Sequence, residues 1–214
     1  QCFYTTKKAV TVKPLGRLGN LMFEYASAYG IAEQAGASFC LGQQSGEFSF
    51  DALREAFVGP FPLDCPRRSE EKITEVGYAV HDTSLVVSAR KGSVEVGGYL
   101  QSPKYFERVA SKIRKQFEFK QGVLSKAQAV ITGLRQFKQR LVGIHVRRGD
   151  YMAHGYLNFP PASYFEAAMA QFPNHKFVVV STEVDWCRAQ PFFAKNADVL
   201  VLPNDRAGAV DMAI

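Results

Sequence analysis

Two adjacent arginines, Arg147 and Arg148, directly follow an apolar segment in the stretch "LVGIHVRRGDYM". A guanidinium group binds an anion through paired hydrogen bonds and stays charged at every ordinary pH. The pair therefore indicates a site for an anion. Two other interpretations stay open here: a solvated pair of surface charges with Asp150 as a local ion-pair partner, or an Arg-Gly-Asp adhesion loop. The adhesion loop is disfavoured because it needs a long flexible tip, whereas this tripeptide follows a core segment.

The apolar segment before the arginines predicts the element that positions them. Residues Leu141 to Val146 are rich in β-branched side chains and too short for a spanning helix, so they predict a strand buried on both faces. His145 lies within this strand, and we expect a core histidine there rather than a catalytic base. Ligands of open α/β sheets bind beyond the carboxyl ends of the strands. The arginines are therefore expected beside a ligand crevice, with Gly149 and Asp150 turning the chain.

A second glycine-containing turn lies in "PLGRLGN", near the start of the chain. Gly16 and Gly19 bracket a predicted strand-to-helix turn, where a ligand could approach the backbone closely. Asn20 is expected to begin a helix whose free N–H groups favour negative charge. The spacing matches neither the dinucleotide fingerprint nor the P-loop. A structural glycine turn without a ligand is therefore the alternative.

The composition excludes several classes of protein. The chain has 214 residues, of which 47% are hydrophobic and 13% aromatic, so it is folded and long enough for one large or two small domains. Its formal net charge is +6, but the basic residues are scattered, which favours a small anion over nucleic acid. The four cysteines and four histidines show no metal-binding spacing. The cysteines could form disulfides or stay as buried thiols, and no transmembrane run or signal peptide is evident.

Strands and helices are predicted to alternate along the chain. Gly36 is placed to end the first helix, and Ser102 and Pro103 are placed to begin a later one. Such alternation predicts an α/β fold with a parallel sheet. The predicted strands are 9–12, a segment within 93–101, 141–146, 177–180 and 199–202, and the predicted helices are 21–35, 103–117, 124–137, 163–171 and one beginning near 182.

Taken together, five ordered segments carry a family resemblance: "GRLGNLMFEYASAYGIAEQAG", "GGYLQSPKYFERVASKIRKQFEF", "LVGIHVRRGDYM", "FVVVSTEVDWCRAQPFF" and "VDMAI". The chain resembles the galactoside 2-alpha-L-fucosyltransferases over nearly its whole length. The "HVRRGDY" segment is shared with a wider group of fucosyltransferases that use GDP-fucose. The "GYLQSPKYF" and "VVVSTEVDWC" segments look like the alpha-1,2 group in particular.

The resemblance implies an inverting glycosyltransferase with a GT-B-like fold, built from two Rossmann-like parallel-sheet domains. Residues 1–138 would form an N-terminal α/β domain on the acceptor side, and residues 139–214 would begin a GDP-fucose-binding domain that is incomplete. The enzyme would transfer L-fucose from GDP-fucose to the 2-hydroxyl of a terminal galactose on a glycan, with inversion and with no metal or other cofactor. The sequence departs from the family at Leu21, where Gln is usual, and in stopping at "DMAI", where the family continues.

The resemblance also implies roles for individual residues. Without a metal, the protein must supply positive charge as the diphosphate leaves. Arg147 would contact the β-phosphate, and its loss is expected to cost on the order of 10²–10³ in rate. Arg148 would anchor the loop or touch the donor, and Asp150 would orient Arg147 or act on a sugar. The expected catalytic residues are Arg147 and Asp150, and the expected donor-binding residues are Arg17, Asn20, His145, Arg147 and Arg148.

The general base is not singled out by the sequence, and its candidates are Asp150, His154 and Glu24. A protein O-fucosyltransferase, a non-catalytic sugar-nucleotide-binding relative and an inactive fragment are the alternative functions. The expected partners are GDP-fucose and a galactose-terminated glycan, with no nucleic acid. In an animal, the resemblance implies a Golgi enzyme facing the lumen, held in the membrane by an N-terminal signal anchor absent from this chain. In a bacterium it implies a cytoplasmic enzyme.

Overall fold

The computed structural model describes residues 8–42, 47–62, 71–153 and 159–214 of the chain. Internal contacts divide it into two compact units, residues 1–123 and 124–214. The sequence placed the boundary later, between residues 138 and 139. The helix between these two positions belongs mainly to the second unit, because its Leu134 packs with Val178 and Leu202. The acceptor and donor roles expected of the two domains stay predictions.

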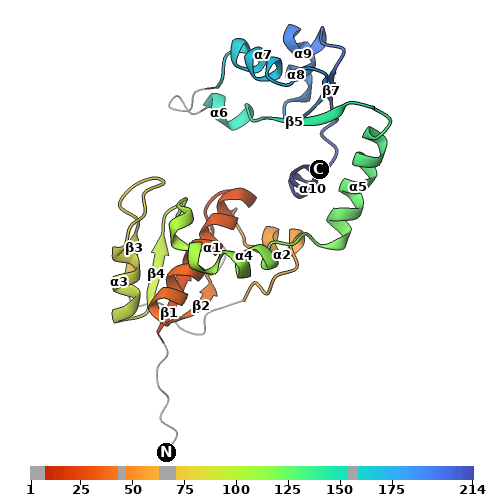
Figure 1. Ribbon diagram of the computed structural model, residues 1–214. Helices are drawn as coiled ribbons and strands as arrows, with labels where there is room; N and C mark the ends of the chain where they lie inside the picture. The colour runs from red at the N-terminus through yellow and green to blue at the C-terminus, as the bar shows by residue number, and fades with distance from the viewer. Residues whose placement is uncertain (1–7, 43–46, 63–70, 154–158) are drawn as a thin grey trace, which may run out of the picture. The chain divides into compact units, whose positions relative to one another are not determined.

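The first unit contains a four-stranded parallel sheet (Figure 1). Its strand order is β2-β1-β4-β3, so the first strand lies inside the sheet, between the second and the fourth. Val10 of β1 is paired with Phe39 on one side and Val94 on the other. All four carboxyl ends therefore lie along one edge of the sheet. The strands are β1 (Ala9–Val12), β2 (Ser38–Leu41), β3 (Glu71–Thr74) and β4 (Val94–Gly97).

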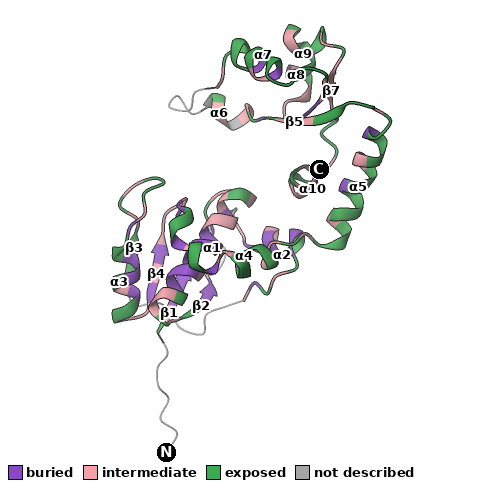
Figure 2. Cartoon of the chain, viewed as in Figure 1, coloured by how far each residue is buried: buried purple, intermediate pink, exposed green. Residues whose placement is uncertain are grey.

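The longest helix of this unit, α1, spans Leu18–Ala35, three residues more at its start than predicted. Gly36 ends it in the left-handed conformation, as expected, and its N–H bonds to carbonyls of the last turn. The core lies between this helix and the strands, which are largely coloured as buried in Figure 2. Val10, Ile31 and Val94 in this core have no exposed surface. The other helices of the unit are α2 (Asp51–Ala56), α3 (Ser84–Lys91) and α4 (Ala110–Gln116).

The single helix predicted for residues 103–117 is wrong at its start. The structure has two 3-10 turns there, η1 (Pro103–Tyr105) and η2 (Glu107–Val109), before α4 begins. The backbone of this segment is pressed against α1: a Cβ on Gly30 would overlap the Tyr105 carbonyl oxygen. That oxygen accepts a hydrogen bond from Gln34 Nε2 over 2.8 Å. Packing against α1 thus overrides the local helical pattern.

The second unit contains a three-stranded parallel sheet of order β5-β6-β7. The alternation of strands and helices confirms the predicted α/β class. Its strands are β5 (Arg140–Val146), β6 (His175–Ser181) and β7 (Val199–Val201). Its helices are α5 (Gln121–Leu134), α6 (Gly149–Ala153), α7 (Ala162–Ala170), α8 (Val184–Ala189), α9 (Pro191–Ala194) and α10 (Gly208–Ala213).

The expectation that β5 is buried on both faces is wrong. Val146 is its one buried residue, and Val142 and Ile144 on the same face pack partly into the core of the unit. Leu141 and His145, on the opposite face, are exposed. The reason is that β5 is the end strand of this sheet among the described residues, paired with β6 alone. His145 is therefore not a core histidine.

The described cysteines differ in state: Cys40 is disulfide-bonded, whereas Cys187 is a buried free thiol. Cys187 packs with Phe177 and Phe193 in the core of the second unit. Across the part of the chain that the structure describes, no helix has both the length and the apolar character needed to cross a bilayer.

Candidate functional site

The Arg147–Arg148 pair lies directly after the carboxyl end of β5, as predicted. The side chain of Arg147 is exposed, and its guanidinium carbon lies 5.0 Å from the centre of the Tyr151 ring. Stacking on an aromatic ring limits the orientations of a guanidinium. Arg147 is thus placed at the edge of the sheet where α/β proteins bind ligands.

Arg148 is fixed between the loops that follow β5 and β6. Its Nη1 lies 3.4 Å from Glu183 Oε2, and its guanidinium carbon lies 5.1 Å from the centre of the Trp186 ring. Glu183 is itself held, because its N–H donates to Ser181 Oγ over 2.9 Å. This is the geometry of an anchoring residue, the first of the two roles considered for Arg148. We name Arg148, Glu183 and Trp186 the arginine clamp.

Asp150 lies in the short helix α6, which begins at Gly149. The Met152 N–H donates to the Arg148 carbonyl over 3.1 Å, so the first turn of α6 is closed onto the second arginine. The side chain of Asp150 and the whole of His154, two candidates for the general base, lie outside the residues that the structure describes. Their predicted roles stay predictions.

The glycine turn of the first unit places Arg17 and Asn20 at the carboxyl end of β1. Gly16 has φ +86°, and a Cβ there would overlap the side-chain amide of Asn20. Gly19 differs: it lies in the first turn of α1, and a Cβ would meet nothing within 4 Å. Arg17 is the exposed N-cap residue of α1. The helix therefore begins before Asn20, and Gly16 alone is required by the turn.

The side chain of Asn20 is held by a residue that the sequence did not indicate. Gln101 Nε2 donates to Asn20 Oδ1 over 2.8 Å. Gln101 follows β4, the neighbour of β1 in the sheet, so the bond joins the loop after β4 to the first turn of α1. The one sequence signal was the position of Gln101 within "GYLQSPKYF", one of the segments that carry the family resemblance.

Glu24 lies beneath this turn and has no exposed surface. Its Oε2 accepts the Leu15 N–H over 3.0 Å, and its Oε1 makes no hydrogen bond with any described residue. Burial raises the pKa of Glu24 to about 8, partly offset by the Leu15 N–H. Glu24 has no exposed surface from which to meet an acceptor hydroxyl in this structure, and its candidacy as the general base stays a prediction. Leu21 is also buried, so the departure from the usual Gln serves packing.

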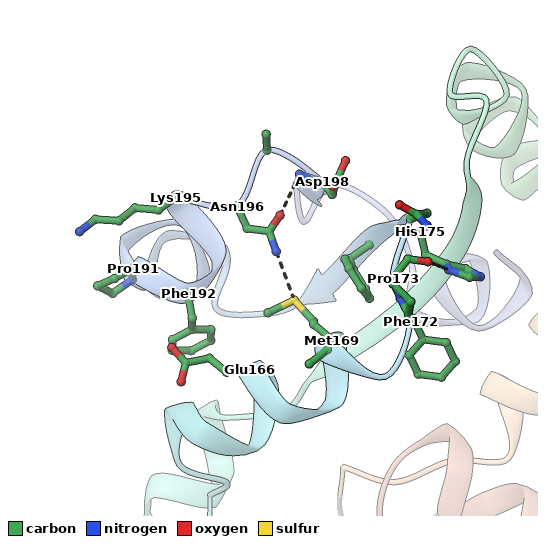
Figure 3. Close-up of a pocket in the computed structure, with 14 residues that line it drawn as sticks. Glu166, Met169, Phe172, Pro173, His175, Pro191, Phe192, Lys195, Asn196 and Asp198 are labelled. Atoms are coloured by element: carbon green, nitrogen blue, oxygen red, sulfur yellow. Dashed lines mark hydrogen bonds between the residues drawn. The ribbon is translucent and has the colours of Figure 1, made fainter.

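A surface pocket in the second unit lies away from these residues (Figure 3). It has a volume of about 570 Å³ and is found at the amino ends of β6 and β7, whereas Arg147 follows a carboxyl end. Asn196 crosses it, donating to Met169 Sδ and accepting the Asp198 N–H (Figure 3). None of the predicted site residues lines it. In the described ranges, no group of three or more His, Cys, Asp or Glu side chains could hold a metal ion.

In a comparison with protein families, residues 83–201 match the model of glycosyl transferase family 11. The matched range includes the segments that contain Gln101, the two arginines and the arginine clamp. It covers more than half of the chain.

Curated relatives are similar over most of the chain. Galactoside alpha-(1,2)-fucosyltransferase 2 of Oryctolagus cuniculus is 27% identical over 93% of this chain and 58% of its own length. Galactoside alpha-(1,2)-fucosyltransferase 1 of Aotus azarae is 28% identical over 89% of this chain and 54% of its own length. The chain thus spans little more than half the length of these relatives.

Solved structures of fucosyltransferases share the fold. The fucosyltransferase NodZ from Bradyrhizobium matches with a TM-score of 0.59 at 13% identity, over 98% of this chain and 83% of NodZ. A mutant of Arabidopsis thaliana FUT1 in complex with GDP matches with a TM-score of 0.51 at 10% identity, over 91% of this chain and 59% of FUT1. The α/β fold with two parallel sheets is therefore the GT-B-like fold of these fucosyltransferases.

Proposed function

The chain belongs to glycosyl transferase family 11, and from this premise we propose that it transfers L-fucose from GDP-fucose to the 2-hydroxyl of a terminal galactose on a glycan. The proposed reaction inverts the configuration at the fucose carbon and uses no metal. The names of the similar relatives support the acceptor and the linkage. A structure of NodZ soaked with GDP-fucose, which shares the fold, supports the donor.

The observation that carries this proposal is the difference between the two arginines: Arg148 is anchored within the protein, whereas Arg147 is exposed. The arginine clamp holds Arg148 by an ion pair and an aromatic ring. Arg147, next to this anchor, is an exposed residue at the carboxyl end of β5. In the proposed reaction Arg147 binds the β-phosphate and offsets the negative charge that grows on the leaving diphosphate. Because the contact strengthens with that charge, it accelerates transfer more than it tightens donor binding.

The other site residues take supporting roles in the proposal. Arg17 and Asn20 contact the donor from the turn after β1, where Gln101 fixes the amide of Asn20. His145, on the exposed face of β5, contacts the nucleotide. Asp150 orients Arg147 or acts on a sugar.

The experiment that tests the proposed function is a turnover assay with GDP-fucose and a β-galactoside acceptor such as lactose. We expect fucose on O2 of galactose, identified by linkage analysis of the product, and the same rate with and without EDTA. Fucose on a small disulfide-rich protein domain but not on lactose would indicate a protein O-fucosyltransferase. A strict requirement for Mn²⁺ would contradict the metal-independent mechanism.

The proposed location is the lumenal face of the Golgi membrane if the source is an animal, and the cytoplasm if it is a bacterium. The disulfide at Cys40 supports an oxidising compartment, because cytosolic reductants remove most disulfides. Protease protection of the tagged protein in microsomes tests this location. Digestion without detergent would contradict it.

A further inference from the structure

A loop joins β3 to α3 in the first unit (Figure 1). Large apolar side chains of this loop are exposed. Val76 is 77% exposed, Tyr78 is 73% exposed and Val80 is 49% exposed. Clustered apolar side chains in contact with water often mark a binding surface. The loop directly follows the carboxyl end of β3, the same edge of the sheet that carries Asn20 and Gln101.

Hydrogen bonds hold both ends of this loop. Asp82, which is buried, accepts the Val76 N–H over 3.3 Å and the Ser84 hydroxyl over 2.6 Å. The hydroxyl of Tyr105 donates to the Val80 carbonyl over 3.2 Å and accepts the Asp82 N–H over 2.8 Å. Tyr105 has no exposed surface. A loop fixed at both ends loses little conformational entropy when a ligand binds to its tip.

The loop after β4 is held in a strained conformation beside it. Leu100 has φ +50°, which is unfavourable for a residue with a branched side chain. Three hydrogen bonds fix it: its N–H donates to Glu75 Oε1 over 2.9 Å, and its carbonyl accepts from Ser27 Oγ and from the Ser102 N–H, each over 2.8 Å. Strain that is fixed in this way commonly occurs at ligand-binding sites.

The strained residue separates Tyr99 from Gln101. On one side, Tyr99 meets Tyr78 edge to face, with ring centres 6.5 Å apart and an interplanar angle of 84°. On the other side, Gln101 bonds to Asn20. The side chains of Tyr78, Tyr99, Gln101 and Asn20 therefore follow one another along the carboxyl edge of the sheet, in the segments after β3, β4 and β1. We name Tyr78, Tyr99 and Gln101 the edge row.

We propose that the edge row binds the sugar acceptor, with the rings of Tyr78 and Tyr99 against the apolar face of a sugar and the amide of Gln101 near its hydroxyls. This inference rests on the proposed function and assigns the acceptor to named residues. A sugar ring combines an apolar C–H face with a rim of hydroxyls, so it matches aromatic faces flanked by amides. Two carboxylates of the neighbouring loops, Glu75 and Asp82, each accept a backbone N–H group and are thereby held within the loops, which suits a neutral ligand.

The test measures acceptor KM and donor KM separately in Tyr78→Ala and Tyr99→Ala. We expect the KM for lactose to rise about tenfold in each, the scale of one aromatic contact at a binding site, while the KM for GDP-fucose stays within about twofold. Tyr78→Phe keeps the ring and is expected to retain the wild-type KM for lactose. Tyr164→Ala removes an exposed tyrosine of the second unit and is the matched control.

Ligand-observed NMR of lactose with each protein separates this inference from the proposed function, because it needs no turnover. Binding to the wild type that weakens in Tyr78→Ala supports the edge row even if no fucose is transferred, in which case the proposed function alone fails. Equal binding of lactose by the wild type and both alanine variants overturns the inference, as does a wild type that binds none. An effect confined to a glycoprotein acceptor would overturn it in favour of a protein-docking surface. Thermal unfolding confirms that each variant is folded.

Discussion

Gln101 and Asn20, 81 residues apart in the sequence, are joined by a hydrogen bond of 2.8 Å between their side-chain amides. The bond ties the loop after β4 to the first turn of α1. The Asn20 amide also lies where a Cβ on Gly16 would be, so the glycine leaves room for it at the sheet edge. The geometry of the predicted donor residue thus depends on a glycine before it and on a distant glutamine.

Gly16 and Gly19 are expected to respond differently to alanine. Gly16→Ala places a side chain at φ +86°, against the Asn20 amide, and should lower the free energy of unfolding by about 1–3 kcal/mol. Gly19→Ala meets open space within a helix and should be neutral or stabilising by up to about 1 kcal/mol. Urea unfolding of both variants checks this. Equal destabilisation would show that the turn is not as described.

Gln101→Leu is expected to release Asn20 without unfolding the protein. One hydrogen bond contributes about 1 kcal/mol, whereas a displaced donor contact should raise the KM for GDP-fucose several-fold. Gln34→Leu is the matched control, because Gln34 makes a bond of the same length to the Tyr105 carbonyl. Steady-state kinetics of both variants give the answer. If Gln34→Leu changes the donor KM as much as Gln101→Leu does, Gln101 has no special positioning role.

Glu183→Gln is expected to loosen the arginine clamp. The two side chains are 28% and 36% exposed, so the ion pair should contribute no more than about 1 kcal/mol to stability. The substitution should lower kcat instead, because Arg147 is adjacent in the chain to the anchored Arg148. Asp198→Asn weakens the pair with Lys176 at the amino ends of β6 and β7, the edge opposite the arginines, and should leave kcat unchanged. A loss of melting temperature without a loss of kcat would leave the clamp a purely structural role.

The buried carboxyl of Glu24 is expected to make stability depend on pH. Its pKa is raised from 4.5 to about 8 in the folded protein, so the folded state holds this proton more tightly than the unfolded state does. The contribution of the protonated Glu24 carboxyl to folding stability is complete below about pH 4.5 and is lost as the pH rises to about 8. Glu24→Gln should therefore be more stable than the wild type above this range. Unfolding curves of the wild type and of Glu24→Gln at about pH 6 and about pH 9 test this. The same change in the free energy of unfolding between the two pH values in both proteins would contradict it.

The sequence was sufficient for features that depend on local pattern. The β-branched run at Ala9–Val12, the glycine after α1 and the apolar strand before Arg147 each specify their own element. Burial of β5 could not be predicted in this way, because it depends on which strands flank it and which layers cover it. The 3-10 turns after Ser102 likewise depend on the fit of the Tyr105 backbone to Gly30, a contact between distant segments.

The residues of the candidate site also fall into those that the sequence predicted and those that it did not. The arginines and the glycine turn were visible because they directly adjoin apolar segments. Gln101, Glu75 and Leu100 were not, since their importance comes from hydrogen bonds between loops that the sheet brings together. Residue type alone does not reveal that Leu100 has a strained backbone or that Glu75 accepts the Leu100 N–H.

The most direct test of the central claim is the kcat for fucose transfer by Arg147→Ala, compared with Arg140→Ala. Arg140 is an exposed arginine at the opposite end of the same strand, so its variant controls for charge and for changes in β5. We predict a loss in kcat on the order of 10²–10³ for Arg147→Ala and wild-type kcat for Arg140→Ala. A folded Arg147→Ala protein that transfers fucose at the wild-type rate would contradict the account.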